Sequence, residues 1–330
     1  MNERDLLQRL IAGPASGDAL ARASGQTRAA VWKRIAGLRA AGLHIQAQPG
    51  RGYVLAQPLE LLDAEAIAAG LPPSARAVLA GLEVAWSLDS TNSELLRRPA
   101  PAVGATVLLA ERQTGGRGRR GRAWVSPLAA NLTFSLSRQF AGGLARLPGL
   151  SLVTGVATAE ALQALGFPQV RLKWPNDLVV ADGGGLRKLG GLLVEGGGEN
   201  AGPVRAVIGL GLNVCMPRGN AVGIDQPWID LAALAGAERA DGAPSRNRIA
   251  AGLLAHWLPA LAQFDADGLA PFLARYAAFD ALAGRDVVLD PGEAARPARA
   301  LGLAPDGALR VEVDGREQRV HAGEISVRAA

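Results

Sequence analysis

The sequence has few of the residues that build disulfides and zinc centres. Its single cysteine, Cys215, excludes an internal disulfide framework. Its three histidines, His44, His256 and His321, lie too far apart to suggest a zinc motif. No stretch approaches the roughly 18–20 apolar residues of a membrane span, and the first residues lack the apolar core of a signal peptide. These absences predict a cytoplasmic protein of a reducing compartment, with no membrane partner.

Lysine is also scarce, because only three of the 35 basic residues are lysines: Lys33, Lys173 and Lys188. The abundance of arginine, alanine and glycine is typical of GC-rich codon usage, so the net charge of +5 alone indicates little. The 330 residues are enough for two or three domains. A hydrophobic fraction of 49% and a charged fraction of 20% are ordinary for globular proteins and argue against intrinsic disorder.

The positive charge is concentrated at the N-terminus. Residues 1–60 hold eight basic and four acidic residues, whereas the other 270 hold 27 basic and 26 acidic ones. No acidic residue lies between Asp18 and Glu60. A local basic excess of this kind is typical of a nucleic-acid-binding segment.

The apolar spacing of this segment predicts three short helices followed by a hairpin. We expect helices over 5–11, up to Ser24 with Ser16 as its N-cap, and over 28–41 with Thr27 as its N-cap, then strands at 43–46 and 53–55. This order predicts a winged helix-turn-helix with the third helix in the DNA major groove. The candidate DNA-binding residues are Thr27, Arg28, Lys33, Arg34 and Arg39 on that helix and Arg51 at the wing tip. A small helical module for protein contacts is the alternative interpretation.

Strand-like and helix-like segments alternate from Leu82 onward. In the segment Asp89-Ser90-Thr91-Asn92, Ser90 or Thr91 can cap a helix, and capping alone would explain the cluster. After a strand at 106–110 comes a loop, 115–122, that holds four glycines and four arginines. Backbone amides and guanidinium groups of such a loop can enclose phosphate or carboxylate oxygens, although it lacks the Gly-Lys-Ser/Thr of a Walker A loop. A flexible loop that merely touches nucleic acid is the alternative.

Three lysine- and glycine-containing segments complete the candidate site. Lys173, Asn176 and Asp177 flank a sharp turn between strands, where they suit a triphosphate with Mg²⁺, although Pro-Asn-Asp is also ordinary turn chemistry. Lys188 opens an apolar strand, an unusual place for a cation. The strand over 207–214 contains glycines that leave room for a flat ligand, and no helix follows as a dinucleotide fingerprint requires.

Taken together, these residues resemble the biotin protein ligases, in the bifunctional form that also represses the biotin operon. The matching segments are Asp89–Asn92, Gln113 with the loop 116–122, Lys173–Asp177, Arg187–Glu195, Gly209–Val214 and Gly323–Arg328. They occur in the family's order, and with the winged helix the resemblance covers nearly the whole chain. It implies that biotin and MgATP give biotinyl-5′-AMP, from which biotin passes to a lysine of a biotin carboxyl carrier protein of acetyl-CoA carboxylase.

The resemblance also implies roles for individual residues. Biotin would be bound by Ser90, Thr91, Asn92, Gln113, Arg117, Gly118, Arg119 and Lys188. Of these, Arg117, Arg119 and Lys188 would act on the reacting groups. ATP and the adenylate would be bound by Arg122, Lys173, Asn176, Asp177, Asn213 and Trp228, with Asp177 as the Mg²⁺ ligand. Residues 216–220 depart from the family's pattern, so no roles are carried over to them.

The sequence therefore predicts an α+β protein of three domains. These are a winged helix-turn-helix over 1–62, a mixed-sheet biotin/lipoate ligase-like catalytic domain over 63–280, and an SH3-like β-barrel over 281–330, where Asp-Gly turns separate apolar runs. Glu324 and Arg328 would touch the active site or lie on a solvated β surface. We expect operator DNA as a partner and a homodimer when the adenylate is bound. A lipoate or octanoate ligase and a biotin sensor without ligase activity are the alternatives.

Overall fold

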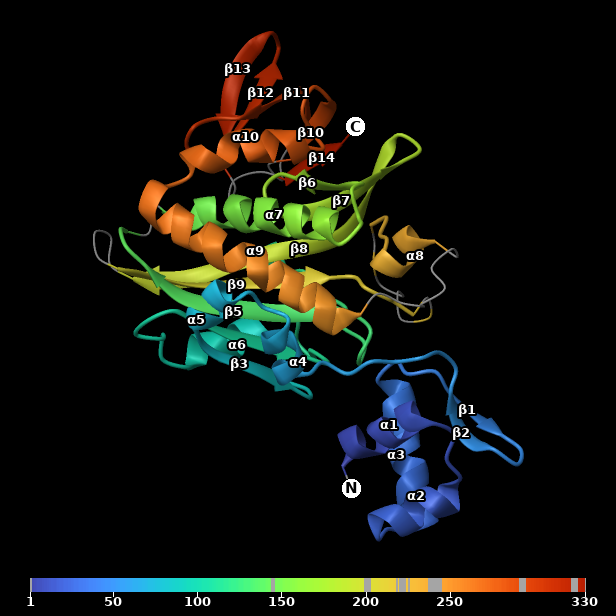
Figure 1. Cartoon of the computed structure of the whole chain (residues 1–330). Coiled ribbons are helices and arrows are strands. Elements are labelled where there is room, and N and C mark those ends of the chain that lie inside the picture. Colours follow the sequence, from blue (N-terminus) through green and yellow to red (C-terminus); the bar gives the residue numbers. More distant parts are fainter. Residues whose placement is uncertain are drawn as a thin grey trace.

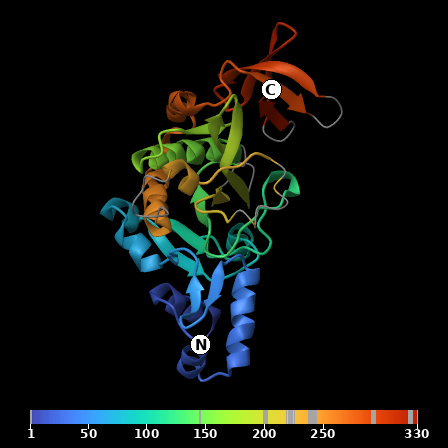
Figure 2. The same cartoon turned by 90° about the vertical axis from the view of Figure 1, so that its right-hand side faces the viewer.

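The computed structural model describes residues 2–143, 146–198, 203–217, 219, 224, 226–236, 245–290, 295–321 and the backbone of 326–329. Its helices and strands form three units that follow one another from the N-terminus to the C-terminus (Figures 1 and 2). Within these residues the strands form sheets of two, seven and five strands. No helix in the described part of the chain is long and apolar enough to span a bilayer.

The N-terminal unit is the predicted winged helix-turn-helix. It consists of α1 (Glu3–Ala12), α2 (Gly17–Ser24), α3 (Arg28–Ala40), β1 (Ile45–Gln48) and β2 (Gly52–Leu55). Ser16 and Thr27 cap α2 and α3 as predicted, and Gly25 ends α2 in the left-handed conformation that the tight turn requires. The first strand begins two residues later than predicted, at Ile45, because its register is set by pairing with Leu55.

A mixed seven-stranded sheet forms the central unit. Its order is β3-β4-β5-β9-β8-β7-β6, in which only β3 and β4 are parallel. The strands are β3 (Leu79–Ala85), β4 (Ala105–Ala110), β5 (Leu132–Phe140), β6 (Val170–Lys173), β7 (Asp177–Asp182), β8 (Gly185–Gly198) and β9 (Val204–Leu212). The structure thereby confirms the predicted mixed sheet.

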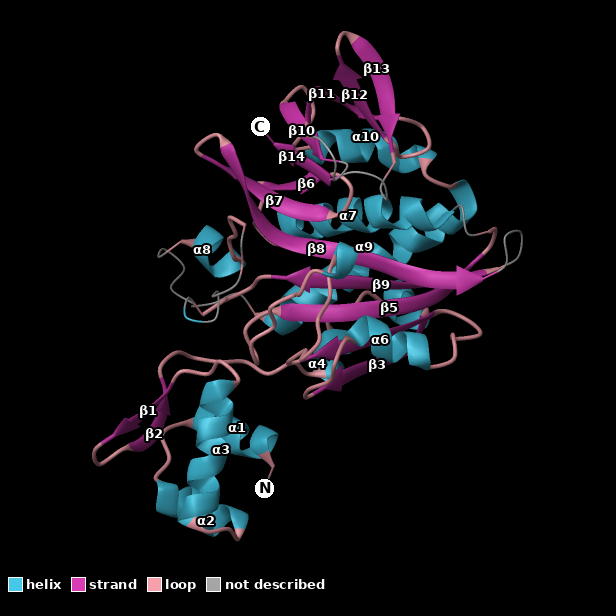
Figure 3. Cartoon of the chain, turned by 180° about the vertical axis from the view of Figure 1, so that it is seen from behind, coloured by secondary structure: helices cyan, strands magenta, loops and turns pink. Residues whose placement is uncertain are grey.

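Helices cover both faces of this sheet (Figures 1 and 3). The long helices α7 (Leu147–Ala164) and α9 (Arg246–Asp267) pack against each other on one face, together with α4 (Ala64–Ala69), α5 (Pro73–Ala77) and α10 (Ala270–Phe279). On the other face, α6 (Thr91–Arg97) places Leu95 against Leu108 of β4 and Val207 of β9. The short α8 (Leu231–Ala235) follows β9 at the edge of the site.

The C-terminal unit is an antiparallel sheet of order β13-β12-β11-β10-β14. Its strands are β10 (Asp286–Asp290), β11 (Arg296–Leu303), β12 (Leu309–Val313), β13 (Arg316–Val320) and β14 (Ser326–Ala329). The predicted Asp-Gly turns do connect these strands. Their apolar faces join the main hydrophobic core, and Trp174 Nε1 donates to the Gly307 carbonyl 3.0 Å away. Closure of this sheet into a barrel stays a prediction. Glu324 and the side chain of Arg328 lie outside the described residues.

Polar contacts hold the connector between the first two units. Residues 58–63 form no helix or strand. The Leu62 amide donates to Glu111 Oε1 at 2.5 Å, and Glu111 Oε2 is paired at 2.8 Å with Arg246 Nη1. Asn247 Nδ2 donates to the Leu61 carbonyl at 2.9 Å. The connector is therefore fixed to the end of β4 and to the first turn of α9.

Candidate functional site

Three polar residues at the start of α6 are buried where β3 turns into the helix. Ser90, Thr91 and Asn92 are only 5%, 3% and 3% exposed. Ser90 caps α6 by accepting from the Ser93 amide at 3.4 Å, which confirms capping for this residue. Thr91 and Asn92 make other contacts, so capping does not explain the whole cluster.

A hydrogen-bonded network links this turn to the strands beneath it. Gln113 Oε1 accepts from the Thr91 amide at 2.7 Å and from Thr91 Oγ1 at 3.1 Å. Ser135 of β5 places its Oγ 2.6 Å from Thr91 Oγ1 and 2.5 Å from Asn92 Oδ1. The network fixes the direction of each donor and acceptor, so the turn can recognise a ligand by its pattern of hydrogen-bonding groups.

Asn92 connects the network to a carboxylate on β8. Its Nδ2 donates to Glu195 Oε2 at 2.8 Å and to the Leu193 carbonyl at 3.2 Å. Glu195 Oε1 in turn lies 3.4 Å from Arg117 Nη2. Asn92 packs directly against the backbone of β9. It can do so because residue 209 is glycine: a Cβ there would lie 2.3 Å from Asn92 Oδ1.

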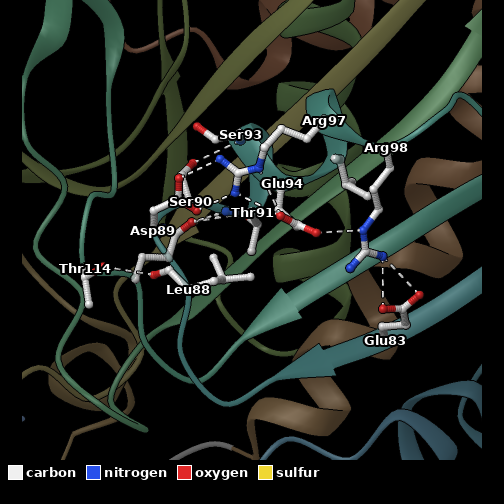
Figure 4. Close-up of polar contacts among 12 residues, drawn as sticks. Glu83, Leu88, Asp89, Ser90, Thr91, Ser93, Glu94, Arg97, Arg98 and Thr114 are labelled. Carbon is white, nitrogen blue, oxygen red and sulfur yellow. Dashed lines mark hydrogen bonds and ion pairs between the residues drawn. The ribbon is translucent and has the colours of Figure 1, made fainter.

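A chain of ion pairs braces the turn from outside (Figure 4). Arg97 Nη2 contacts Asp89 Oδ1 at 2.8 Å and Glu94 Oε2 at 2.8 Å, and Arg98 contacts Glu94 and Glu83, each at 3.0 Å. Hydrogen bonds from the Arg97 guanidinium are the main reason that the pKa of the Asp89 carboxyl lies well below its usual range. Because these ion pairs are partly exposed, they contribute little to the free energy of unfolding. Their main effect is to hold the turn against α6.

The glycine-arginine loop folds back over this turn. The Gly115 amide donates to the Asp89 carbonyl at 2.8 Å, and the Trp124 amide donates to the Gly116 carbonyl at 2.9 Å. The loop contains a single 3-10 turn at Arg119–Gly121, which the glycine count alone did not predict. Arg122, predicted to bind phosphate, has an exposed side chain at the end of this loop.

Arg119 and Arg117 leave the loop in different directions. Arg117 Nη2 reaches Ser93 Oγ at 2.9 Å, on the side of the buried polar turn. Arg119 Nη1 donates to Asn176 Oδ1 at 3.2 Å, on the side of the β6–β7 hairpin. Burial lowers the pKa of Arg119, and the Asp177 charge opposes that shift. The loop thus connects the two halves of the candidate site through two guanidinium groups.

The β6–β7 hairpin and β8 bring the predicted lysine and carboxylate together. Lys188 Nζ lies 2.7 Å from Asp177 Oδ1, and both side chains are 19% exposed. Strand β8 begins at Gly185, three residues before the predicted start, so Lys188 lies inside the strand rather than at its beginning. Asn176 Nδ2 donates to the Leu192 carbonyl at 2.7 Å, which fastens the hairpin turn to β8. Lys173 is half-buried opposite Asp177 in the hairpin register.

Trp228 and Asn213 lie beside the lysine. The Lys188 amide donates to the Pro227 carbonyl, and the Ile229 amide donates to the Lys188 carbonyl, each at 2.9 Å. Asn213 is 4% exposed, and its Nδ2 donates to the Ile229 carbonyl at 3.1 Å. Asn213 therefore holds the segment that carries the half-buried Trp228 next to Lys188. Arg218 and Asn220, in the divergent part of this loop, lie outside the described residues.

Three residues without predicted roles also belong to the site. Ser135 and Glu195 complete the buried network, and Trp124 lies so close to β9 that a Cβ at Gly211 would be 2.5 Å from Trp124 Cε2. The indole Nε1 of Trp124 is buried and makes no hydrogen bond within the described residues. Residues 131–136 alternate between polar and apolar side chains, which predicts a strand, and β9 is rich in glycine, but neither signal identifies the partner strand.

The candidate DNA-binding residues lie on the surface of the N-terminal unit. Thr27 uses its hydroxyl to accept from the Ala30 amide at 3.2 Å, and Arg28 Nε lies 3.2 Å from Asp18 Oδ1. Lys33 is exposed and Arg34 half-buried, whereas Arg39 Nε donates to the Ile45 carbonyl at 2.8 Å and braces the wing. Arg51 is exposed at the tip between β1 and β2.

Two protein-family models match separate parts of the chain. A family model described as the biotin/lipoate A/B protein ligase family matches residues 85–213. A second, described as an HTH domain, matches residues 2–54. The first range contains most of the site described above, and the second contains the candidate DNA-binding residues.

Individual proteins match over nearly the whole chain. The bifunctional ligase/repressor BirA of Escherichia coli strain K12 is 39% identical over 315 residues, which covers 96% of this chain and 93% of that protein. BirA of Salmonella typhimurium is 40% identical with the same coverage. The structure of the biotin protein ligase from Aquifex aeolicus in complex with biotin and ATP gives a TM-score of 0.62 at 25% identity, covering 76% of this chain and 100% of that chain.

Proposed function

The chain belongs to the biotin protein ligase family, in the form that carries an N-terminal repressor domain, and from that premise we propose which of its residues perform each step. The protein is an ATP-dependent biotin–protein ligase and has a helix-turn-helix repressor domain. Biotin and ATP are its ligands. The observation that supports the assignment of steps best is the 2.7 Å ion pair of Lys188 with Asp177, directly after Asn176, whose Oδ1 accepts from Arg119 at 3.2 Å.

The buried turn binds the uncharged ring end of biotin. Thr91, Asn92 and Gln113 offer donors and acceptors in fixed directions, and Ser90 shapes the turn that presents them. A ureido group has one carbonyl and two N–H groups, so it needs both kinds of partner. Because these side chains are buried in fixed directions, only a ligand with matching N–H and carbonyl groups regains there the hydrogen bonds that it loses from water, which gives selectivity.

The cations act at the other end of biotin. In the first step a biotin carboxylate oxygen attacks the α-phosphorus of ATP, the bond to the β-phosphate oxygen breaks, and pyrophosphate leaves. Two anions must meet, so Lys188, Arg117 and Arg119 lower the barrier by neutralising both. Gly118 lets the loop pass close over the biotin tail, and Arg122 extends the positive charge toward the phosphates.

The β6–β7 hairpin binds the nucleotide. Asp177 would supply a carboxylate to the Mg²⁺ that accompanies ATP, since this ion commonly takes one or two carboxylates together with phosphate oxygens and water. Lys173 and Asn176 orient the phosphates, while Asn213 keeps Trp228 in place beside the adenylate.

In the second step the carrier lysine attacks the biotinyl carbonyl. The new amide bond forms as AMP leaves and the amine loses its protons to solvent. The acceptor is the biotin carboxyl carrier protein of acetyl-CoA carboxylase. The adenylate also favours a homodimer that binds operator DNA through α3 and the wing. The three domains span residues 1–62, 63–280 and 281–330. The protein acts in the cytoplasm.

The ligase assignment is tested with the full chain, MgATP, labelled biotin and a purified carrier domain. We expect pyrophosphate release that depends on biotin, and label on the carrier only when both substrates are present. Lipoate and octanoate serve as competing substrates. Transfer of either in preference to biotin would contradict the proposed recognition of the ureido group.

The repressor half has its own test. We expect preformed biotinyl-5′-AMP to tighten binding of the full chain to DNA from promoters of biotin synthesis genes. Binding should weaken steeply between about 50 and 200 mM salt, because basic residues displace counterions from phosphates. Fluorescence anisotropy measures both effects. Equal binding with and without the adenylate would refute the co-repressor role while leaving the ligase assignment intact.

A glycine substitution tests the biotin-binding turn. A Cβ at Gly209 would lie 2.3 Å from Asn92 Oδ1, so Gly209→Ala should displace Asn92 and raise the KM for biotin about tenfold, as expected for one lost hydrogen bond. The KM for ATP should change little. Gly197→Ala on the neighbouring β8 is the matched control, because its Cβ would meet nothing within 4 Å. Equal biotin KM values for the two variants would contradict the role of Asn92.

A further inference from the structure

The side chain of Trp32 on α3 is large, apolar and exposed, and it is not part of the hydrophobic core of the N-terminal unit. Val31, Ile35 and Leu38 form the buried face of the helix and are each 0% exposed. Trp32, in contrast, is 62% exposed, and it is the largest of the exposed hydrophobic side chains among the residues that the structure describes. A solvent-exposed indole contributes little to folding, so a contact outside the N-terminal unit is the simplest reason for tryptophan there.

The neighbours of Trp32 indicate what that contact is. Arg28, which is paired with Asp18 at 3.2 Å, lies one helical turn before it and the exposed Lys33 directly after it, and no acidic residue occurs between Asp18 and Glu60 in the sequence. A cationic face of this kind fits a polyanion better than a protein surface of mixed charge. Ala29 and Ala36 lie one turn on either side of Trp32, so small side chains leave the indole accessible.

The indole differs chemically from its neighbours. Arg28 and Lys33 suit phosphates, which position a protein on DNA without reading sequence. Within the major groove, the apolar group that distinguishes one base pair from another is the C5-methyl of thymine. Trp32 is the fifth residue of α3, in the half of the recognition helix that faces base edges. We infer that Trp32 reads a thymine methyl in each operator half-site and sets sequence specificity more than affinity. This inference rests on the proposed repressor function.

The test uses the full chain with biotin and MgATP and a random duplex DNA library. The wild type and Trp32→Ala are each taken through selection, and the sequences that they retain are compared. We expect the wild type to select a thymine at one position of the DNA, and Trp32→Ala to show no base preference at that position. Replacing that thymine by uracil removes only the methyl group, and it should weaken wild-type binding about fourfold, as for one buried methyl. Binding by the variant should be unaffected by the replacement.

Matched measurements separate this role from others. Lys33→Ala should weaken binding to all sequences and reduce its salt dependence while keeping the same selected thymine. The melting temperature of Trp32→Ala should equal that of the wild type, since the side chain is mostly exposed. If both proteins select the same sequence with the same sensitivity to uracil, Trp32 does not read a base. If the wild type selects no sequence at all, the repressor function itself fails, and the inference fails with it.

Discussion

Lys188→Ala is expected to slow the formation of biotinyl-5′-AMP by about a hundred- to a thousandfold, the loss typical of removing one group that stabilises developing charge. Lys188 Nζ is 19% exposed and lies 2.7 Å from Asp177 Oδ1, so its charge is only partly screened by water. In the adenylation step two anions approach each other, and the proposed role of Lys188 is to neutralise them. Pyrophosphate release in a single turnover at saturating biotin and MgATP measures the effect directly.

Two further measurements locate the defect in one step. Preformed biotinyl-5′-AMP bypasses the first step, so carrier labelling from it should fall much less than labelling from biotin and ATP. Lys188→Arg keeps the charge but changes its position, and it should recover only part of the rate. Arg316→Ala is the control variant and should retain full activity. Arg316 is exposed on β13 and lies far from the site residues in the sequence. Adenylation by Lys188→Ala within tenfold of the wild type would contradict the assignment.

The local features of the site were predictable from the sequence because they depend on short-range rules. Ser16, Thr27 and Ser90 cap their helices as their positions predict. The polar turn after Lys173 is the hairpin that its residues predict. In each case backbone geometry within a few residues decides the structure, so propensity and spacing were enough.

Contacts between distant strands were not predictable in this way. Glu195 and Asn92 are 103 positions apart, and Ser135 and Thr91 are 44 apart. Their pairing depends on the strand order β5-β9-β8, which no single-sequence pattern gives. The segment of β5 around Ser135 illustrates the limit: it reads as alternating, yet both of its faces are buried because helices cover both sides of the sheet.

Glu111→Ala is expected to lower the free energy of unfolding by about 3–5 kcal/mol, because the buried guanidinium of Arg246 then keeps only carbonyl acceptors and no negative charge beside it. The side chains of Arg246 and Glu111 are only 5% and 3% exposed, and Glu111 also accepts from the Leu62 amide in the connector. Denaturant unfolding measures the loss. The connector should also become accessible to limited proteolysis, since one of its anchors on the catalytic unit is removed.

An exposed ion pair serves as the control that separates the effect of burial on stability from the effect of ion pairing itself. Arg310 and Glu317 form a pair of similar geometry, with a 2.7 Å contact, but on the exposed face of the C-terminal sheet. Glu317→Ala should therefore leave the melting temperature nearly unchanged. The double variant Glu111→Leu with Arg246→Met should regain much of the stability lost by Glu111→Ala, since no charge is then buried alone. If Glu111→Ala unfolds no more easily than Glu317→Ala, the buried pair does not hold the connector. If stability recovers in the double variant but proteolysis of the connector persists, the hydrogen bonds of Glu111 to the Leu62 amide and of Arg246 to the Glu60 carbonyl, and not charge balance, keep the DNA-binding unit attached to the catalytic sheet.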